Sequence, residues 1–258
     1  MRRIAALAVA GLLAFGAYKV IGKRPNPEVL HDATTVFRDD HQQNPTAIDC
    51  PTDVPVLLII GQSNAANYGE TRGISRAANF YQGRCYQARD PLLGASGDRG
   101  SIWTRLPFEG VIAPIAIGSS RMEEWAPGGR LFPRIQLTIL QLREAGMPPT
   151  HALILQGASD ARRGTDPKAY LENARNLVAY LKAQGVKTYM GKASGCGDAK
   201  HEGIRQAQEL SGAIPGPDLD RVRRRINGCH LRSRDLRLLA EQWSRVLIVP
   251  PALPPPST

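Results

Sequence analysis

The sequence lacks several patterns that would point to common classes of function. Its four cysteines form no Cys-x-x-Cys pair, the spacing that zinc sites and redox motifs use. It has no internal repeat and no stretch of basic residues interleaved with aromatic ones, although its formal net charge is +10. These absences argue against a metal site and against a nucleic-acid partner.

The positive charge is distributed unevenly along the chain. Part of it belongs to one run near the carboxyl end, Arg221-Val-Arg-Arg-Arg225, and part to the N-terminal segment. A solvated basic helix face accounts for such a run, and so does attraction to an acidic envelope polymer or an anionic membrane surface.

The only long apolar run of the N-terminal segment is short for a membrane span. It extends from Ile4 to Ala17, whereas a spanning helix needs about 20 residues, a length that is approached only by counting through Ile21. Basic residues precede and follow it, which is typical of an export signal. Residues 1–25 are therefore expected to be a cleaved signal or an uncleaved anchor, with membrane association through residues 4–21. Either way, the protein is expected in the periplasm or the cell envelope.

The remainder of the chain divides by composition. Residues 26–50 are polar without a sustained period and are interpreted as a linker or arm, and residues 250–258 as a proline-rich tail. Overall the chain is 42% apolar and 22% charged, which is typical of globular proteins. Residues 51–249 are predicted to form one domain.

Within that domain, short apolar runs alternate with longer amphipathic ones. The predicted strands are Val56–Ile60, Val111–Ile117, His151–Leu155 and Val186–Met190. The predicted helices are Pro133–Ala145, Pro167–Gln184, His201–Leu210 and Arg232–Arg245. This alternation predicts an α/β fold, a three-layer α/β/α sandwich with a mainly parallel sheet, similar to flavodoxin. Pro114 suggests that its strand lies at an edge or starts irregularly.

About forty residues between Gly69 and Val111 show weak periodicity and contain many glycines. A loop of that length is usually functional, or it is ordered by something such as a disulfide. Cys85 lies inside it, which favours the pairing Cys50–Cys85 and leaves Cys196–Cys229 as the second disulfide. The other two pairings and four free thiols are the alternatives, and disulfides are compatible with export.

Polar residues follow each predicted strand at the edge where α/β sheets bind ligands. They are Gly61-Gln-Ser63-Asn64, Gly118-Ser119-Ser120 and Gln156-Gly-Ala158-Ser159-Asp160, joined before the last helix by Asn227-Gly-Cys-His230. Ser63 is either the N-cap of a helix or a nucleophile held at the carboxyl end of a strand. The four segments place a hydroxyl, glycine amides, a carboxamide and an imidazole at one edge of one sheet.

These four segments, in this order over residues 54–245, resemble the SGNH hydrolase superfamily. The GQSN sequence at 61–64 is similar to that of its sialate O-acetylesterase-like carbohydrate esterases. The resemblance implies that Ser63 is the nucleophile and His230 the general base. It further implies an oxyanion hole formed by the backbone N–H groups of Ser63 and Gly118 and the side chain of Gln156. The implied activity, which needs no metal or cofactor, is removal of O-acetyl groups from a carbohydrate through an acyl-enzyme.

The sequence departs from this family at three positions. Asn227 stands where the family has the aspartate that supports the histidine, a change that lowers kcat about 10⁴-fold in a serine protease. Asp218 and Asp220 are the nearest carboxylates that could act instead, and a Ser–His dyad is the other possibility. The remaining departures are Ser119 in place of a glycine and Ala158 in place of a glutamate.

Two alternatives to an esterase follow from the same residues. An acyltransferase would use a sugar hydroxyl in place of water, and an inactive glycan-binding protein would be consistent with Asn227. Trp103 and Trp125 suit either stacking on a sugar or ordinary packing. The sequence leaves the oligomeric state open.

Overall fold

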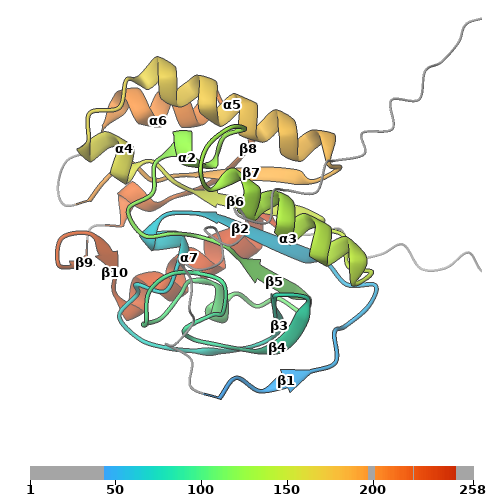
Figure 1. Ribbon diagram of the computed structural model, residues 1–258. Helices are drawn as coiled ribbons and strands as arrows, with labels where there is room; N and C mark the ends of the chain where they lie inside the picture. Colours follow the sequence, from blue (N-terminus) through green and yellow to red (C-terminus); the bar gives the residue numbers. More distant parts are fainter. Residues whose placement is uncertain (1–43, 197–200, 223, 248–258) are drawn as a thin grey trace, which may run out of the picture.

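The strand β2, Val56–Gly61, lies at the centre of the fold, and all six of its residues are buried. A strand that is apolar on both faces suits a parallel sheet covered on both sides. In the computed structural model, which describes residues 44–196, 201–222 and 224–247, β2 pairs in parallel with β5 on one side and β6 on the other (Figure 1).

The sheet has eight strands in the order β1-β4-β3-β5-β2-β6-β7-β8. Their bounds are Ala47–Ile48 (β1), Val56–Gly61 (β2), Ile74–Tyr81 (β3), Arg84–Arg89 (β4), Val111–Pro114 (β5), His151–Leu155 (β6), Lys187–Lys192 (β7) and Ile214–Asp218 (β8). All pairs from β3 to β8 are parallel, and β1 and β4 are antiparallel to their neighbours. A separate hairpin of β9 (Arg225–Ile226) and β10 (His230–Leu231) follows the sheet.

Helices cover both faces of the sheet. They are α2 (Met122–Trp125), α3 (Phe132–Glu144), α4 (Ala158–Arg162), α5 (Pro167–Ala183), α6 (Glu202–Glu209) and α7 (Ser233–Val246), with 3-10 turns η1 (Ser63–Ala65), η2 (Trp103–Arg105) and η3 (Leu219–Arg221). The apolar residues of α2, α3, α5 and α6 form one core with Val56, Leu58 and Ile60. Those of α7 and η2 form a second core with Leu57 and Ile59. The alternation of side chains along β2 thus builds two cores and three layers (Figure 1).

This architecture confirms the predicted α/β sandwich with its mainly parallel sheet. Each predicted helix is present, and no end is shifted by more than one residue. After β2 the chain adds β3, β4 and β5 on one side of it, and then β6, β7 and β8 on the other side. The order of the strands therefore reverses direction at β2. Ligands bind beyond the carboxyl end of the strands at such a point.

The long insertion after Gly69 is not a loop throughout, and that expectation was wrong. It contains the hairpin of β3 and β4, which extends the sheet by two strands. Gln82 and Gly83 join the strands with positive φ angles of 48° and 78°. A two-residue turn of this kind matches the twist of a hairpin, and Gln is not the Asn or Asp that usually signals it.

The strand containing Pro114 is not an edge strand, because β5 lies between β3 and β2. Val111 and Ile115 donate backbone hydrogen bonds toward β2, so the nitrogen of Pro114 faces β3. The pairing with β3 ends at Ile112. Pro114 lies beyond the last residue of β5 that pairs with β3. Its lack of an N–H group therefore removes no hydrogen bond between the two strands.

Both edges of the sheet also differ from the prediction. Residues 44–50 are part of the fold rather than of a linker, since β1 pairs with β4. Gly216, Pro217 and Asp218, which no predicted strand included, belong to the edge strand β8, where prolines are tolerated. The expected signal or anchor at residues 1–25 and the tail at 250–258 lie outside the described residues. No helix of the described part is long and apolar enough to cross a membrane.

Candidate active site

Ser63 lies directly beyond the central strand β2. The backbone turns at Gly61, whose φ is +140°, and a side chain at this position would place Cβ 2.1 Å from the carbonyl oxygen of Leu155. Gln62 then donates its backbone N–H to the same carbonyl, and Ser63 begins the short helix η1. The cap residue of η1 is Gln62, and no side chain caps it. The N-cap interpretation of Ser63 is therefore wrong, and its hydroxyl makes no capping hydrogen bond.

The side chain of Gln62 ties the serine turn to the next strand end. Its Oε1 accepts hydrogen bonds from the backbone N–H groups of Gly157, at 3.2 Å, and Ser159, at 2.9 Å. Nothing in the sequence indicates a role for Gln62 beyond its place in the GQSN sequence. These two hydrogen bonds join the carboxyl ends of β2 and β6, so the backbone on either side of Ser63 is held in place.

A cavity of about 260 Å³ opens at this edge of the sheet. Four of the five predicted site residues line it, namely Ser63, Gly118, Asn227 and His230. Ser63 is 7% exposed, and its hydroxyl has no hydrogen-bond partner among the described residues. The fold thus brings together residues up to 167 positions apart in the chain.

His230 is half-buried on β10, and its ring stacks on the ring of Tyr68 with centroids 5.1 Å apart. Burial lowers the pKa of His230 below its ordinary value, and the positive charges of Arg99 and Arg225 lower it further. A neutral imidazole is the form that accepts a proton. No hydrogen bond joins it to Ser63 in the described structure, a feature that substrate-free catalytic pairs often show.

Asn227 occupies a turn position and does not support the imidazole. Asn227 and Gly228 have positive φ angles of 45° and 71°, and Cys229 donates its N–H to Ile226 at 3.1 Å. This is a two-residue hairpin turn, for which Asn-Gly is the preferred sequence. The Asn227 Oδ1 accepts from the backbone N–H of His230 at 3.4 Å. In this structure the side chain of Asn227 bonds to the hairpin backbone and not to the imidazole, so its expected catalytic role stays a prediction.

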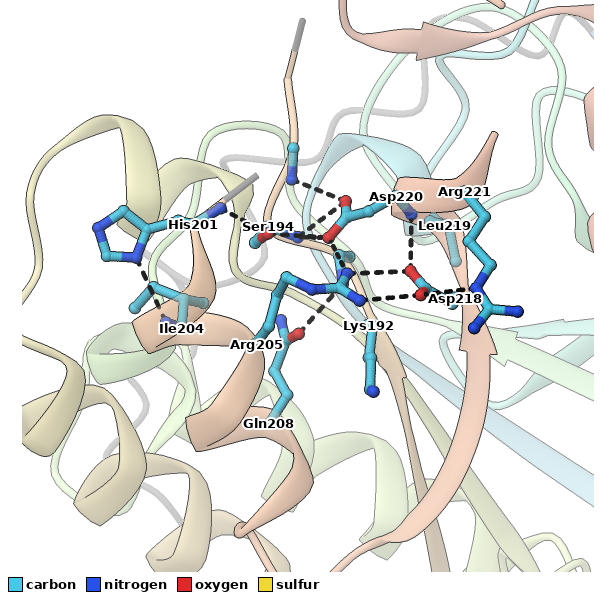
Figure 2. Close-up of polar contacts among 12 residues, drawn as sticks. Lys192, Ser194, His201, Ile204, Arg205, Gln208, Asp218, Leu219, Asp220 and Arg221 are labelled. Atoms are coloured by element: carbon cyan, nitrogen blue, oxygen red, sulfur yellow. Dashed lines mark hydrogen bonds and ion pairs between the residues drawn. The ribbon is translucent and has the colours of Figure 1, made fainter. Parts of the chain in front are cut away.

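Asp218 and Asp220 do not replace the missing carboxylate either. Arg205 donates to Asp218 at 3.0 and 2.9 Å and to Asp220 at 2.6 Å (Figure 2). Asp220 also accepts from the backbone N–H groups of Ser194 and Gly195. Burial alone would raise the pKa of Asp218, but the hydrogen bonds and charge of Arg205 outweigh it and the pKa is lowered. Both carboxylates bind Arg205, and neither forms a hydrogen bond with the imidazole of His230.

The glycine turn after β5 supplies backbone donors to the cavity. The N–H of Gly118 points at the Ser96 hydroxyl, 2.7 Å away, whereas those of Ser63 and Ser119 have no partner among the described residues. Ser119 has a φ of +62°, where glycine is favoured, so the serine at this position carries backbone strain. The hydroxyl of Tyr68 lies 2.5 Å from an ideal Cβ at Gly118, which explains the glycine there.

Gln156 does not line the cavity, and its expected role in the oxyanion hole is wrong. The residue is 0% exposed, and its Nε2 donates to the carbonyl of Ser120 at 2.8 Å and to Asp160 at 2.7 Å. Both N–H groups of the amide are therefore used inside the protein. Burial raises the pKa of Asp160, which also accepts from the N–H of Met122. Through these bonds to Ser120 and Met122, Gln156 and Asp160 stabilise the segment that follows Gly118, on the side away from the cavity.

Two residues that the sequence analysis did not assign to the site line the cavity. Tyr68 contacts both His230 and Gly118, and Arg162 of α4 brings a positive charge. Tyr68 follows Ser63 by five residues, which was its only sequence signal. Trp103 and Trp125 are fully buried in the two cores, so packing accounts for them.

The structure joins Cys50 to Cys85 and Cys196 to Cys229, the pairing that the sequence favours. The second disulfide lines the cavity next to His230. Two disulfides are typical of proteins exported to an oxidising compartment. The described residues contain no group of three or more His, Cys, Asp or Glu side chains that could hold a metal ion.

Comparison with known proteins gives structural matches alone. No family model matches the chain, and no curated protein matches it. The chain is similar to a protein from Arabidopsis thaliana of known X-ray structure, with 18% identity and a TM-score of 0.61, over 75% of this chain and 97% of that one. The psychrotrophic esterase EstA from Pseudoalteromonas sp. matches at 15% identity, 72% and 93% coverage and a TM-score of 0.45. The acetyl xylan esterase AlAXEase matches at 13% identity, 54% and 82% coverage and a TM-score of 0.42. At these identities the likeness to the Arabidopsis protein establishes the α/β fold.

Proposed function

We propose that this protein is an exported serine esterase of the SGNH type, which removes O-acetyl groups from a carbohydrate. The observation that carries the proposal is one cavity at the carboxyl end of β2 that holds the Ser63 hydroxyl, which caps no helix, together with the imidazole of His230, whose pKa is lowered by burial. Backbone N–H groups without partners lie in the same cavity. A nucleophile, a base and oxyanion donors are the set that acyl transfer requires.

The chemistry proceeds in two steps. The Ser63 oxygen attacks the acyl carbon while the imidazole of His230 takes its proton, and the imidazolium then protonates the departing alcohol. Water, activated by the same imidazole, hydrolyses the acyl-enzyme. The oxyanion accepts hydrogen bonds from the N–H groups of Ser63 and Ser119. The N–H of Gly118 joins them once its hydrogen bond to the Ser96 hydroxyl is broken. No carboxylate among the described residues supports the imidazolium, and we propose that Ser63 and His230 act together as a dyad.

The decisive experiment is hydrolysis of a simple aryl acetate by the wild-type protein and Ser63→Ala. We expect Ser63→Ala to lose at least about 10³-fold in kcat, since the nucleophile is removed. Ser244→Ala on α7 is the matched control, because its hydroxyl donates to the carbonyl of Glu241 and does not line the cavity. Equal activity of Ser63→Ala and wild type would reject Ser63 as the nucleophile, and no activity in either would favour the inactive glycan-binding protein.

Hydrolysis and transfer are separated by adding an acceptor glycan to the same assay. If the protein is an esterase, acetate release is unchanged by the acceptor. If it is an acyltransferase, acetate release falls as the acetyl group appears on the glycan.

The charge of the cavity favours a substrate with a negative charge near its ester. Among the described residues, Arg162 lines the cavity without an ion-pair partner, and none of those that line it is acidic. A charge-assisted hydrogen bond from Arg162 to a carboxylate, phosphate or sulfate would be worth about 1.5–3 kcal/mol.

This preference is tested with paired acetate esters whose alcohols are neutral or anionic. We expect Arg162→Gln to raise the KM of the anionic ester about tenfold and that of the neutral ester less than twofold. Arg84→Gln, an exposed position on β4 outside the cavity, removes the same charge and should leave both KM values unchanged. An equal effect of Arg162→Gln on both esters would assign Arg162 a role unrelated to substrate charge.

A further inference from the structure

The geometry points to the Cys196–Cys229 disulfide, anchored by Asp220, as the element that positions His230. It would replace in function the carboxylate that normally orients such a histidine. This inference rests on the proposed function of His230 as the general base. Cys196 and Cys229 would be positioning residues, since they act through the histidine and not on the substrate.

The hairpin that carries His230 has little structure of its own. Its strands β9 and β10 have two residues each, and an isolated two-stranded hairpin is marginally stable at best. No described side chain donates to or accepts from the imidazole, which only stacks on Tyr68. The orientation of the ring therefore depends on where the hairpin backbone is held.

The disulfide holds that backbone at the residue directly before His230. Cys229 is bonded to Cys196 in the loop after β7, and both cysteines line the cavity. The Cys229 carbonyl accepts hydrogen bonds from Nδ2 of Asn64, in the serine segment, at 3.3 Å and from Nη1 of Arg225, in β9, at 3.2 Å. Cys229 is thus tied both to the sheet edge and to the nucleophile segment.

The other end of the disulfide is fixed by a buried carboxylate. Asp220 accepts hydrogen bonds from the N–H of Ser194 at 3.1 and 3.0 Å, from its hydroxyl at 2.8 Å and from the N–H of Gly195 at 2.8 Å. Arg205 of α6 donates to the same carboxylate at 2.6 Å (Figure 2). Asp220 is almost fully buried, and four of these five bonds come from the two residues before Cys196. The loop that carries Cys196 is therefore a firm anchor.

This chain of contacts matters because proton transfer needs short distances. The imidazole must come within about 2.6–3.2 Å of the serine hydroxyl, and a misplacement of about 1 Å can cost 10²-fold in rate. Loss of the disulfide is expected to free the hairpin at Cys229. The consequence is a lower kcat with little change in KM, since the surfaces that bind substrate are retained.

The test compares Cys196→Ser/Cys229→Ser with Cys50→Ser/Cys85→Ser. The second variant is the matched control, because it removes the disulfide that joins the segment after β1 to β4, outside the cavity. Aryl acetate turnover is expressed per active site, counted by titration of Ser63 with a fluorophosphonate. We expect a fall of 10- to 100-fold in kcat and less than threefold in KM for the first variant. For the control we expect a lower unfolding temperature with kcat within twofold of wild type.

Reduction of the folded protein covers the case in which the first variant does not fold. In the Cys50→Ser/Cys85→Ser background, Cys196–Cys229 is the one disulfide of the four cysteines that remains. Dithiothreitol reduces it to two thiols and is itself oxidised to its cyclic disulfide. We expect kcat to fall by the same factor and to return on reoxidation, while the far-ultraviolet circular dichroism is unchanged.

A kcat that stays within twofold of wild type after loss of Cys196–Cys229, by substitution or by reduction, overturns the inference. A fall of equal size in kcat in both double variants also overturns it, because the effect would then be general destabilisation. These outcomes differ from failure of the proposed function, in which the wild-type protein shows no turnover that depends on Ser63.

Discussion

The two halves of the candidate site are built in different ways. Ser63 follows a fully buried strand in the middle of the sheet, and its turn is set by the backbone contacts of Gly61 and Gln62. His230 lies on a hairpin of four paired residues at the surface, and that hairpin is held by a disulfide and a few side-chain bonds. The nucleophile is positioned by the core of the fold and the base by tethers.

This difference predicts how each half responds to change. Damage to the nucleophile half disturbs the packing of β2 against β6, so it should cost stability of the whole domain. Damage to the base half should cost catalysis first, since the hairpin lies outside the sheet. Substitutions in each half can separate the two kinds of effect.

The largest effect is expected for Gly61→Ala in the nucleophile half. The new Cβ would lie 2.1 Å from the Leu155 carbonyl oxygen at a φ of +140°, so β2 or β6 must move. Backbone strain and overpacking together predict a loss of about 3 kcal/mol or more in the free energy of unfolding, measured by urea denaturation. Gly212→Ala is the control, because its φ is +84° with nothing within 4 Å of the added atom. We expect about 1 kcal/mol there, and equal losses would contradict the argument from close packing.

A smaller and different effect is expected for Asn227 in the base half. Because its φ is +45° and its side chain bonds to the backbone, the turn explanation predicts that Asn227→Gly keeps kcat. Asn227→Ala should strain the turn by about 1 kcal/mol and lower kcat. The measurement is aryl acetate turnover, with Asn227→Asp as the discriminating variant. The turn explanation predicts that Asn227→Asp changes kcat less than threefold, whereas a triad position predicts a large gain.

The core and the order of the elements were predictable from the sequence. Val56–Ile60 and His151–Leu155 are continuous apolar runs, and Pro133 and Pro167 mark helix starts, so local patterns sufficed. The hairpin of β3 and β4 was missed because its residues do not alternate cleanly. Its pairing depends on a Gln-Gly turn and on neighbouring strands far away in the chain.

The site was predictable in its residues but less so in their roles. Ser63, Gly118 and His230 line one cavity. Ser63 and Gly118 follow from the rule that the strand ends of a parallel sheet converge, whereas His230 lies outside the sheet and was expected only from the resemblance of its segment to a known family. Gln156 faces inward because Ser120 and Asp160 bind its amide, and no local pattern signals that direction. Tyr68 was missed because its contact with His230 joins positions 162 residues apart. Side-chain direction and distant contacts are properties of the folded chain.

The smallest effect concerns the charge around the base. Burial, Arg99 and Arg225 lower the pKa of His230, so the imidazole remains neutral to a lower pH than an ordinary histidine. The protonated ring cannot accept a proton from Ser63, and kcat/KM should therefore fall as the pH drops through this lowered pKa, below about 6.5. Arg99→Gln removes one of the two repelling charges without touching the burial of the ring. We expect the acid limb of the pH profile to move to higher pH, and activity above that limb to be unchanged.

Arg99 is exposed and has no ion-pair partner among the described residues, so added salt should screen its charge and shift the wild-type limb in the same direction. The Arg84→Gln variant controls for the loss of one positive charge, and its limb should coincide with that of the wild type. A shift to lower pH in Arg99→Gln would mean that Arg99 acts on the hairpin and not on the charge of the base. In the expected case, the base half of the site is tuned by surface charge, whereas no exposed charge is needed to position Ser63.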